Sequence, residues 1–375
     1  MPKKIIIVGG GLGGLVSALH LSRKGMDVRL IEKHAYPRHK VCGEYISNEV
    51  LPYLKSLGFD PFDFGAKDIT DFTLSTPGSR SVSAKLPLGG FSISRYCIDG
   101  ELAKMAESYG TKIIQATVRD ITFDRGVFQV STIQHKNYEA DLVIGAFGKR
   151  SNLDVKMQRK FIQRPSPYLG VKAHYKGEFP TEAVGLHNFE GGYCGVSKVE
   201  DESINICYIA DYTSFKKYKN IDDFQQNVLC KNTYLKEVFN NMELIFDKPL
   251  TISQVSFASK DPVEDHILMC GDSAGMIHPL AGNGMSMAIR AAQMVSETIL
   301  KFTNGEISNR QDLEYTYKKK WNAEFAARLN SGHIIAKLFR LGYLSELIMM
   351  VLKIFPFILP LVIKKTHGKP MKPSV

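Results

Sequence analysis

The chain has 375 residues, with 48 Lys or Arg against 38 Asp or Glu, which gives a formal net charge of +10. Its 44% hydrophobic and 23% charged residues are typical of a globular protein and exclude collagen, coiled coils and wholesale disorder. The 6 cysteines never form a C-x-x-C pair, so we expect no disulfide framework and no metal site, and a reducing cytoplasm fits best. The net charge alone leaves nucleic acid, a membrane surface and an acidic substrate open as partners.

The first thirty residues combine a strand, a glycine-rich turn and a helix. Residues 5–8 are a β-branched run typical of a buried parallel strand, and residues 9–14 satisfy G-x-G-x-x-G. Residues 15–24 have helical spacing, and a second apolar run at 28–31 ends on Glu32. Because the turn lies between the expected strand and helix, the pattern predicts a dinucleotide-binding site.

The glycines of this pattern and its terminal acid each have a physical task. Gly9 allows the tight turn, Gly11 allows a pyrophosphate to approach the backbone, and Gly14 allows the helix to pack close to the strand. The helix N-terminus offers N–H groups and a partial positive charge to phosphates, and Glu32 can accept hydrogen bonds from a ribose diol. The alternative interpretation is a purely structural glycine turn.

A second pattern occurs near residue 270. An apolar strand is expected at 266–270, and Gly271-Asp272 follows it. The turn Pro279-x-x-Gly282-x-Gly284 then opens a helix expected over 286–301. An acid at a strand end can hold a ribityl hydroxyl, and the helix opening can direct N–H groups at an electron-rich ring edge. The alternative is an ordinary loop and helix cap.

In order and spacing, these motifs resemble the FAD-dependent oxidoreductases of the aromatic-hydroxylase type, and more closely their geranylgeranyl-reductase-like branch. Residues 36–44 resemble that branch's F-P-R-x-K-x-C-G segment, and Arg95 with Asp99 resembles an R-x-x-x-D-x-x-L pattern whose arginine lies at the flavin. The resemblance implies an α/β fold: a Rossmann-like FAD-binding domain of the glutathione-reductase type, an inserted antiparallel β-sheet substrate domain and a helical C-terminus. The cofactor-binding residues that it implies are Gly9, Gly11, Leu12, Gly13, Gly14, Glu32, Lys33, Arg38, Lys40, Cys42, Arg95, Val118, Gly271, Asp272, Pro279, Gly282, Asn283, Gly284 and Met285.

Two segments depart from the family pattern. Where the hydroxylases have an Asp-Gly pair before R-S, this chain reads A-F-G-K-R-S at residues 146–151, which leaves the source of electrons open. Where the reductase branch has G-G-Y-x-W-x-F-P, residues 191–198 keep G-G-Y but lack the tryptophan and the F-P. Specificity for a prenyl chain therefore does not follow from the resemblance.

Three residues are candidates for catalysis. Cys42 lies in the segment expected near the flavin ring, with Arg38 and Lys40 nearby to favour its thiolate; it could equally be a small residue that packs on the ring. His278, beside the helix-opening turn, could donate a proton, or simply cap or pack. Tyr193 could contact substrate, or be an ordinary strand aromatic.

The remaining segments suggest a discontinuous arrangement of domains. Alternating patterns at 71–74, 168–175 and 204–209 predict an antiparallel sheet over the flavin, and residues 213–248 have helical spacing. We therefore expect the following division: a FAD-binding domain of residues 1–75, 93–151 and 252–300, a substrate domain of 76–92 and 152–251, and a basic helical segment of 301–375.

The C-terminal segment carries most of the charge. Residues 301–375 contain 13 Lys or Arg and 5 Asp or Glu, a net charge of +8. Apolar runs at 347–351 and 354–363 accompany them, but Pro356 and Pro360 interrupt these runs, which are too short to span a bilayer. Docking of this segment on a membrane surface is expected, with packing on the substrate domain as the alternative. Nucleic acid is disfavoured because no aromatic residues alternate with arginine as stacking platforms.

Together with the resemblance, these features predict a FAD-dependent oxidoreductase that acts on a lipophilic substrate, an isoprenoid, polyketide or long-chain aromatic molecule. The resemblance of residues 36–47 to the geranylgeranyl-reductase-like branch implies flavin hydride transfer as the reaction. One alternative is an NAD(P)H-dependent flavin monooxygenase that hydroxylates such a substrate, so NAD(P)H is a candidate electron donor. Another is a non-enzymatic lipid or prenyl carrier on the same fold. The expected location is the cytoplasm, with peripheral binding to the inner face of the membrane; the oligomeric state stays open.

Overall fold

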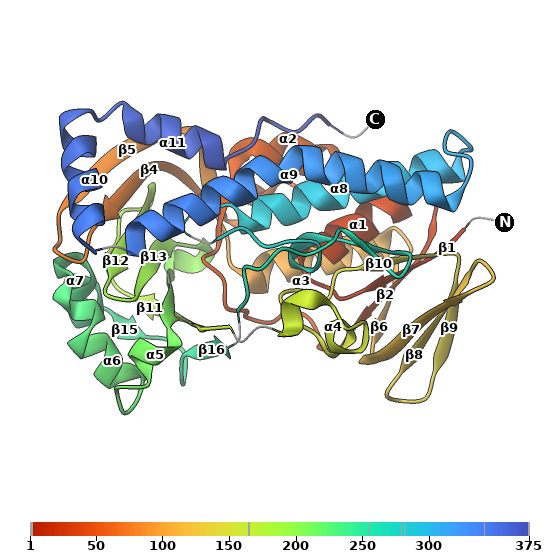
Figure 1. Cartoon of the computed structure of the whole chain (residues 1–375), viewed down its shortest axis with the longest axis horizontal. Helices are drawn as coiled ribbons and strands as arrows, with labels where there is room; N and C mark the ends of the chain where they lie inside the picture. Colours follow the sequence, from red (N-terminus) through yellow and green to blue (C-terminus); the bar gives the residue numbers. More distant parts are fainter. Residues whose placement is uncertain are drawn as a thin grey trace.

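The computed structural model describes residues 3–163, 166–253, 255–278, 280, 282–340 and 342–373. Their strands form a six-stranded, a nine-stranded and a three-stranded sheet, with helices packed on the outer faces (Figure 1).

The six-stranded sheet is built around the predicted nucleotide-binding segment. Its strand order is β17-β18-β10-β1-β2-β6, and all neighbours are parallel except β17 and β18. The strands are β1 (Lys4–Val8), β2 (Asp27–Glu32), β6 (Lys112–Gln115), β10 (Leu142–Gly145), β17 (Val263–Glu264) and β18 (Ile267–Met269). Because both faces are covered, the side chains of β1 are apolar on both sides and Ile5, Ile6 and Ile7 are buried.

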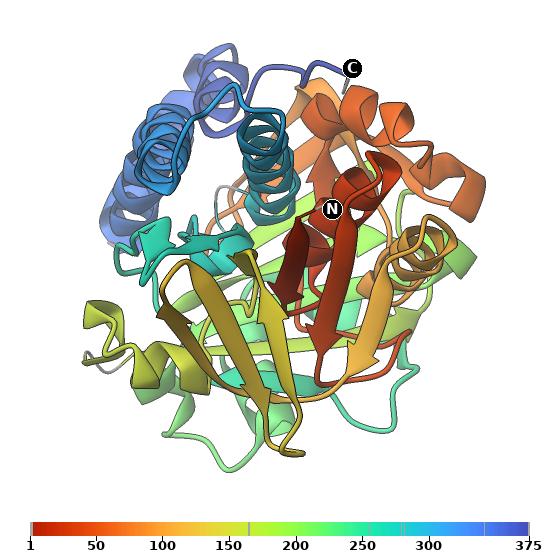
Figure 2. The same cartoon turned by 90° about the vertical axis from the view of Figure 1, so that its right-hand side faces the viewer.

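Helices cover one face of this sheet and a small sheet covers the other (Figure 2). The helices are α1 (Leu12–Arg23), α3 (Arg95–Ser108) and α8 (Gly284–Thr303), and α1 packs against both of the others. The small sheet consists of β7 (Val118–Asp124), β8 (Val127–Thr132) and β9 (Asn137–Ala140). This three-layer α/β arrangement is the one expected for the nucleotide-binding part, with the predicted strands and helices in place.

The nine-stranded sheet contains the strands predicted in the middle of the chain. Its order is β15-β11-β14-β13-β12-β4-β5-β3, and β16 also pairs with β11. The strands are β3 (Tyr45–Ser47), β4 (Lys67–Ser75), β5 (Ser81–Ser92), β11 (Tyr168–Lys176), β12 (Ala183–Phe189), β13 (Gly192–Lys198), β14 (Ile204–Asp211), β15 (Glu243–Leu244) and β16 (Leu250–Ser253). The sheet is antiparallel except for the parallel pair β4 and β12.

This sheet also corrects one expected boundary. Dividing the domains between residues 75 and 76 separates β4 from β5, but these strands pair as a hairpin. β4 therefore belongs with the nine-stranded sheet, because a hairpin strand takes its hydrogen bonds from its neighbour. The rest of the domain division stays a prediction.

Short helices cover the outer face of the nine-stranded sheet. They are α5 (Tyr212–Phe215), α6 (Ile221–Asn227) and α7 (Thr233–Asn241), in the segment predicted to be helical. Phe224, Val228 and Leu235 are buried there as the spacing indicates. The helical expectation was wrong at its end, since residues 243–244 form β15 against β11. Two further short helices are α2 (Leu51–Ser56) and α4 (Asn152–Lys156).

The C-terminal segment forms three helices, α9 (Arg310–Arg340), α10 (Gly342–Ile354) and α11 (Ile358–Thr366). The long α9 lies along α8, and α10 and α11 pack on β5 (Figure 1). Within the described residues no single helix has the length and apolar composition to cross a membrane. The consecutive segments Ser345–Ile354 and Ile358–Thr366 pass that test only together, and they meet at a bend of 119°.

Acid is expected to destabilise the fold through two buried histidines. Burial lowers the pKa of both His20 and His187 to about 4. The unfolded chain, with a histidine pKa near 6.5, then binds more protons than the folded chain between pH 6.5 and 4. Stability present above pH 6.5 should therefore be lost as the pH falls towards 4, by up to about 3 kcal/mol for each histidine.

Urea unfolding measured across this pH range tests the effect. The His187→Gln variant should have a shallower pH dependence, whereas the exposed control His135→Asn should keep the wild-type slope. Equal slopes in all three proteins would contradict the assignment.

Candidate functional site

A cavity of about 1350 Å³ lies between the carboxyl ends of the parallel strands and the nine-stranded sheet. The residues that follow β1, β2, β10 and β18 line one side of it, and residues of β4, β5, β12, β13 and β14 line another. Crevices at the carboxyl ends of parallel strands are the usual binding sites of α/β sheets. Pockets for one ligand usually have volumes of roughly 300–1000 Å³, so this cavity has room for a cofactor and a substrate together.

The glycine turn forms one end of the cavity. Gly9 has a φ of +102°, and a Cβ atom there would lie 2.3 Å from the carbonyl oxygen of Ala146. A Cβ at Gly14 would lie 2.1 Å from the carbonyl oxygen of Gly9, so this glycine serves the packing of α1 and does not line the cavity. No side chain caps the N-terminus of α1 at Gly11. Its first N–H groups are therefore available to a phosphate.

Glu32, the predicted ribose-binding residue, lines the cavity next to the glycine turn. It is buried, and its Oε2 accepts a hydrogen bond from the Gly10 N–H at 2.7 Å. The guanidinium of Arg38 lies 3.8 Å from Oε1. The carboxylate is thus held in place at the end of β2, where the sequence pattern predicts it.

A buried charge cluster lies beside the glycine turn. Asp99 accepts hydrogen bonds from Lys40 Nζ at 2.7 Å and from Arg95 Nε and Nη2 at 2.9 and 2.8 Å. Burial by itself raises the pKa of Asp99, but the charges of Arg95 and Lys40 outweigh it, so the pKa is lowered. Lys40 also donates to the Gly10 carbonyl oxygen at 3.3 Å, which ties the cluster to the glycine turn.

The second predicted motif meets the first in the cavity. Asp272, which follows β18, faces the cavity, and its carboxylate accepts no hydrogen bond from the part of the chain that the structure describes. Gly282, Asn283, Gly284 and Met285, at the N-terminus of α8, line the same cavity. Two helix N-termini, those of α1 and α8, therefore open onto one space. Pro279 lies outside the described residues.

Lys260, which the sequence did not single out, holds this motif in place. Its Nζ is buried and donates to the carbonyl oxygens of Asp272 at 2.6 Å and Lys149 at 2.9 Å. Burial lowers the pKa of Lys260 to about 8, against the opposing effect of Asp272. The ammonium thus joins the two loops that follow β10 and β18.

Lys260→Met is expected to loosen both loops because it leaves the two carbonyl groups unpaired. We expect a loss of about 1–3 kcal/mol in the free energy of unfolding and weaker cofactor binding. Thermal unfolding and cofactor titration measure both effects.

The control is Lys318→Met, which removes only an exposed ion pair with Asp261 and should change neither quantity appreciably. Equal losses of stability and cofactor affinity in both variants would contradict the role of Lys260.

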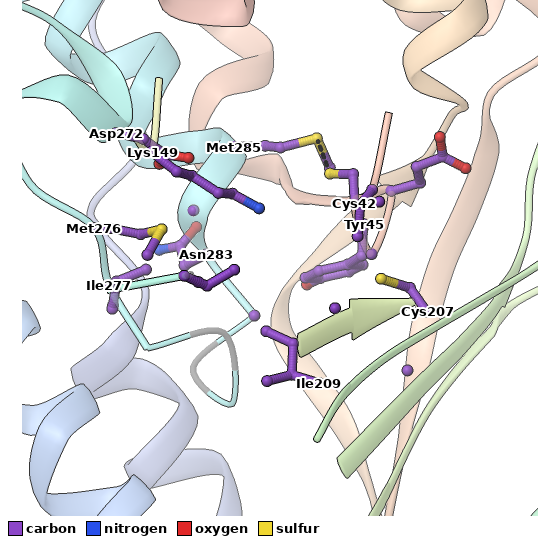
Figure 3. Close-up of a pocket in the computed structure, with 18 of the residues that line it drawn as sticks. Cys42, Tyr45, Lys149, Cys207, Ile209, Asp272, Met276, Ile277, Asn283 and Met285 are labelled. Carbon is purple, nitrogen blue, oxygen red and sulfur yellow. Dashed lines mark hydrogen bonds between the residues drawn. The ribbon is translucent and has the colours of Figure 1, made fainter. Parts of the chain in front are cut away.

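The three catalytic candidates have different positions. Cys42 lines the cavity, and its thiol donates to Met285 Sδ at 3.4 Å (Figure 3). Tyr193 also lines the cavity, and its buried hydroxyl has no hydrogen-bond partner among the described residues. His278 is buried behind the cavity wall, with its ring 4.5 Å from that of Phe257. Its position fits packing better than proton donation.

The structure brings most of the predicted cofactor-binding residues together. Those that line the cavity are Gly9, Gly11, Leu12, Gly13, Glu32, Lys33, Arg38, Lys40, Cys42, Arg95, Gly271, Asp272, Gly282, Asn283, Gly284 and Met285. Val118, at the start of β7, does not line it and packs instead against the main core.

Other lining residues were not predicted. Figure 3 shows Lys149 with its amine directed into the cavity, across from Tyr45 and Cys207. The segment containing Lys149 stood out only as a departure from the family pattern. Tyr45 follows the Cys42 segment directly, so proximity in the sequence was the one available signal. Cys207 is one residue in a strand pattern and carries no local signal.

A buried cluster beside Cys42 was also missed. Glu44, at the left-handed φ of +55°, accepts hydrogen bonds from Lys172 Nζ and from the Arg95 N–H, both at 2.7 Å, and contacts His174 Nε2 at 2.8 Å. Burial by itself raises the pKa of Glu44. The interactions with Lys172 and His174 lower it by more, so the pKa of Glu44 is lowered overall. The cluster fixes the loop of Cys42 against β11 and α3.

These residues fit FAD. The glycine turn that a Cβ would fill, the uncapped helix N-terminus, Glu32 and the unpaired carboxylate of Asp272 match a pyrophosphate, a ribose and a ribityl chain in that order. The N-terminus of α8 would then lie near the ring system.

Comparisons with known proteins agree with this geometry. A model of the FAD binding domain matches residues 3–62. Digeranylgeranylglycerophospholipid reductase 1 of Methanosphaera stadtmanae is 25% identical over 84% of this chain and 79% of its own length. Conditioned medium factor receptor 1 of Dictyostelium discoideum is 24% identical over 86% of this chain and 68% of its own length.

The matched FAD binding domain and the similarity to a reductase support an FAD-dependent oxidoreductase superfamily for this chain. This chain is an FAD-dependent enzyme. The solved structure of the flavin-dependent brominase Bmp2 has the same fold, with a TM-score of 0.78, 17% identity and coverage of 96% of this chain and 93% of that one. The predicted cofactor-binding residues line one end of the cavity, and apolar side chains line the other end.

Proposed function

We propose that this flavoenzyme reduces a carbon–carbon double bond of a lipophilic substrate, an isoprenoid, polyketide or long-chain aromatic molecule. The supporting observation is the unequal distribution of charge in the cavity. Every Asp, Glu, Lys and Arg of its lining lies at the cofactor end, at positions 32, 33, 38, 40, 44, 95, 149, 150 and 272.

The opposite end of the cavity is apolar. Phe72, Leu74 and Leu86 line it from β4 and β5, and Val184 and Leu186 line it from β12. The remaining walls come from α9, α10 and α11 through Leu338, Leu347, Ile348, Val351, Leu352, Ile358, Leu359, Val362 and Ile363. Burying a hydrocarbon chain against such walls contributes roughly 25 cal/mol per Å² of apolar surface removed from water. We call this end the apolar chamber.

Polar groups gather where the two ends of the cavity meet. The hydroxyls of Tyr45 and Tyr193 and the Oδ1 atom of Asn283 are buried and have no hydrogen-bond partner among the residues described. An unsatisfied buried polar group costs about 1–3 kcal/mol, so pairing these atoms would stabilise this part of the protein.

The chemistry divides between cofactor and protein. FAD, when bound and reduced by a two-electron donor such as NAD(P)H, would supply the hydride. The protein binds the chain of the substrate, excludes water and provides a proton. The Cys42 thiol is the candidate proton donor, because it lines the cavity on the cofactor side. The reductase of Methanosphaera stadtmanae, by its name, reduces a geranylgeranyl lipid, which also supports this class of reaction.

Filling the apolar chamber tests the substrate class. Leu186→Trp adds bulk to the chamber wall and replaces none of the predicted FAD contacts. We expect the variant to keep its FAD, read from the visible spectrum, but to bind an unsaturated prenyl lipid at least about tenfold more weakly. The control Ile133→Trp changes an exposed residue of the three-stranded-sheet region and should bind like the wild type. Unchanged binding by Leu186→Trp would contradict the proposal.

A further inference from the structure

The outer side of α10, of α11 and of the turn between them carries exposed apolar side chains that do not line the cavity. They are Met350, Ile354, Phe355, Phe357 and Leu361, which we call the apolar foot. Ile354 and Phe357 are 63% and 64% exposed, and the rings of Phe355 and Phe357 lie 6.1 Å apart. Clusters of large exposed apolar side chains mark interaction surfaces in proteins that otherwise bury such residues.

The inner side of the same helices is fixed to the body of the protein. Met349, Leu352, Leu359 and Ile363 form a small core with Leu74 of β4 and Val82 of β5. The helices are therefore held against the nine-stranded sheet, and the foot is the side that nothing in the described structure covers. The two helices meet at a bend of 119° and are anchored on their inner side, so their outer side faces solvent. Such an outer side can lie along a membrane surface.

Charge identifies the kind of surface that complements the foot. Lys353 adjoins Ile354, and Lys364 and Lys365 lie one helical turn after Leu361. These three lysines are exposed, and none of them forms an ion pair within the described residues. The only acid between residues 342 and 373 is Glu346, which pairs with Arg80 at 3.4 Å. Apolar side chains beside unpaired lysines complement an anionic lipid surface.

The cavity opens beside the foot. Leu347, Val351 and Val362 line the cavity and are also exposed, at 54%, 40% and 36%. On α10, Met350 and Ile354 follow Leu347 and Val351 by three residues, so the cavity-lining stripe and the foot lie side by side. A molecule that leaves a lipid layer at the foot would therefore meet the apolar chamber directly.

We propose that the apolar foot docks on an anionic lipid surface and that the substrate enters the apolar chamber from that surface, between Leu347, Val351 and Val362. The docking stands on the exposed apolar side chains and the unpaired lysines. The entry route rests in addition on the proposed lipophilic substrate.

Flotation of the holoenzyme with vesicles tests the docking. The wild type should bind vesicles that contain phosphatidylglycerol and bind pure phosphatidylcholine vesicles at least tenfold more weakly, and added salt should weaken the binding. The double variant Ile354→Ser/Phe357→Ser and the double variant Lys364→Gln/Lys365→Gln should each lose about tenfold or more in affinity. Since all four side chains are exposed, the variants should keep their fold and their bound FAD.

Matched controls lie elsewhere on the surface. Val127→Ser/Ile133→Ser changes exposed apolar residues of the small sheet, and Lys216→Gln/Lys217→Gln changes exposed lysines next to α5. Both should bind vesicles like the wild type. Absence of vesicle binding by the wild type, or equal binding by the foot variants, would overturn the docking. A dimer that dissociates on substitution of the foot would assign this face to a second copy of the chain and overturn it as well.

Substrate delivery separates the entry route from the reaction. The foot variants should turn over a prenyl lipid dispersed in detergent at the wild-type rate but lose activity on the same lipid in vesicles. Equal activity on both preparations would overturn the entry route and leave the reaction intact. Vesicle binding without turnover of either preparation would contradict the proposed function and leave the docking intact.

Discussion

Replacing Gly9 with alanine is expected to yield a protein without bound FAD. The residue has a φ of +102°, which L-residues rarely adopt, and its new Cβ would lie 2.3 Å from the Ala146 carbonyl oxygen. Because β10 carries Ala146 into the same turn, relief of the clash must move the backbone that faces the pyrophosphate. A cost of roughly 3 kcal/mol corresponds to about a 100-fold loss in FAD affinity.

Titration of the apoprotein with FAD, followed by flavin fluorescence, measures this loss. The control is Gly110→Ala, since Gly110 has a similar φ of +94° but open space around its missing side chain. It should lose stability through backbone strain alone and keep its affinity for FAD. If Gly9→Ala binds FAD as the control does, the turn does not position the pyrophosphate.

Removing the Asp99 carboxylate is expected to have the largest effect on stability. Asp99→Ala leaves Lys40 and Arg95 as buried cations without their shared partner, and breaking a buried pair in this way typically costs about 3–5 kcal/mol. FAD binding should fall too, because Lys40 also contacts the Gly10 carbonyl group of the glycine turn.

Urea unfolding of the apoprotein measures the change in the free energy of unfolding without any contribution from the cofactor. Asp71→Ala is the matched control: its carboxylate pairs with Lys85, but both side chains are largely exposed, so little change is expected. A similar small loss for Asp99→Ala would mean that water already reaches the cluster and that it does not hold the wall of the site.

The parts of the structure that could be predicted from the sequence are those specified by short segments. Gly9, Gly14 and Glu32 are set by the local geometry of a strand, a turn and a helix, and all three lie where the pattern places them. The motif around Asp272 follows the same rule. Alternation along 204–209 predicts β14 because its side chains face opposite sides of one sheet.

Features that depend on distant pairing could not be predicted in this way. The parallel pairing of β4 with β12 joins segments more than a hundred residues apart, and Lys172 reaches Glu44 across 128 positions. Neither contact leaves a local trace in the sequence. Tyr45 and Cys207 likewise reach the cavity only because β3 and β14, which lie far apart in the sequence, join one sheet that faces it. In the C-terminal segment, the composition indicated that some apolar side chains pack on the protein and others are exposed. It did not indicate which side chains belong to which group.

Oxidation of the reduced flavin by a lipophilic alkene, in the absence of oxygen, tests the central claim most directly. The holoenzyme is reduced with light under argon and then mixed with geranylgeraniol as a probe, while flavin absorbance and the mass of the lipid are followed. We predict that the oxidised flavin spectrum returns and that the lipid gains a hydride and a proton at a double bond. A flavin that stays reduced until oxygen is admitted, with oxygen incorporated into the lipid, would contradict the proposed reduction and assign the enzyme to hydroxylation.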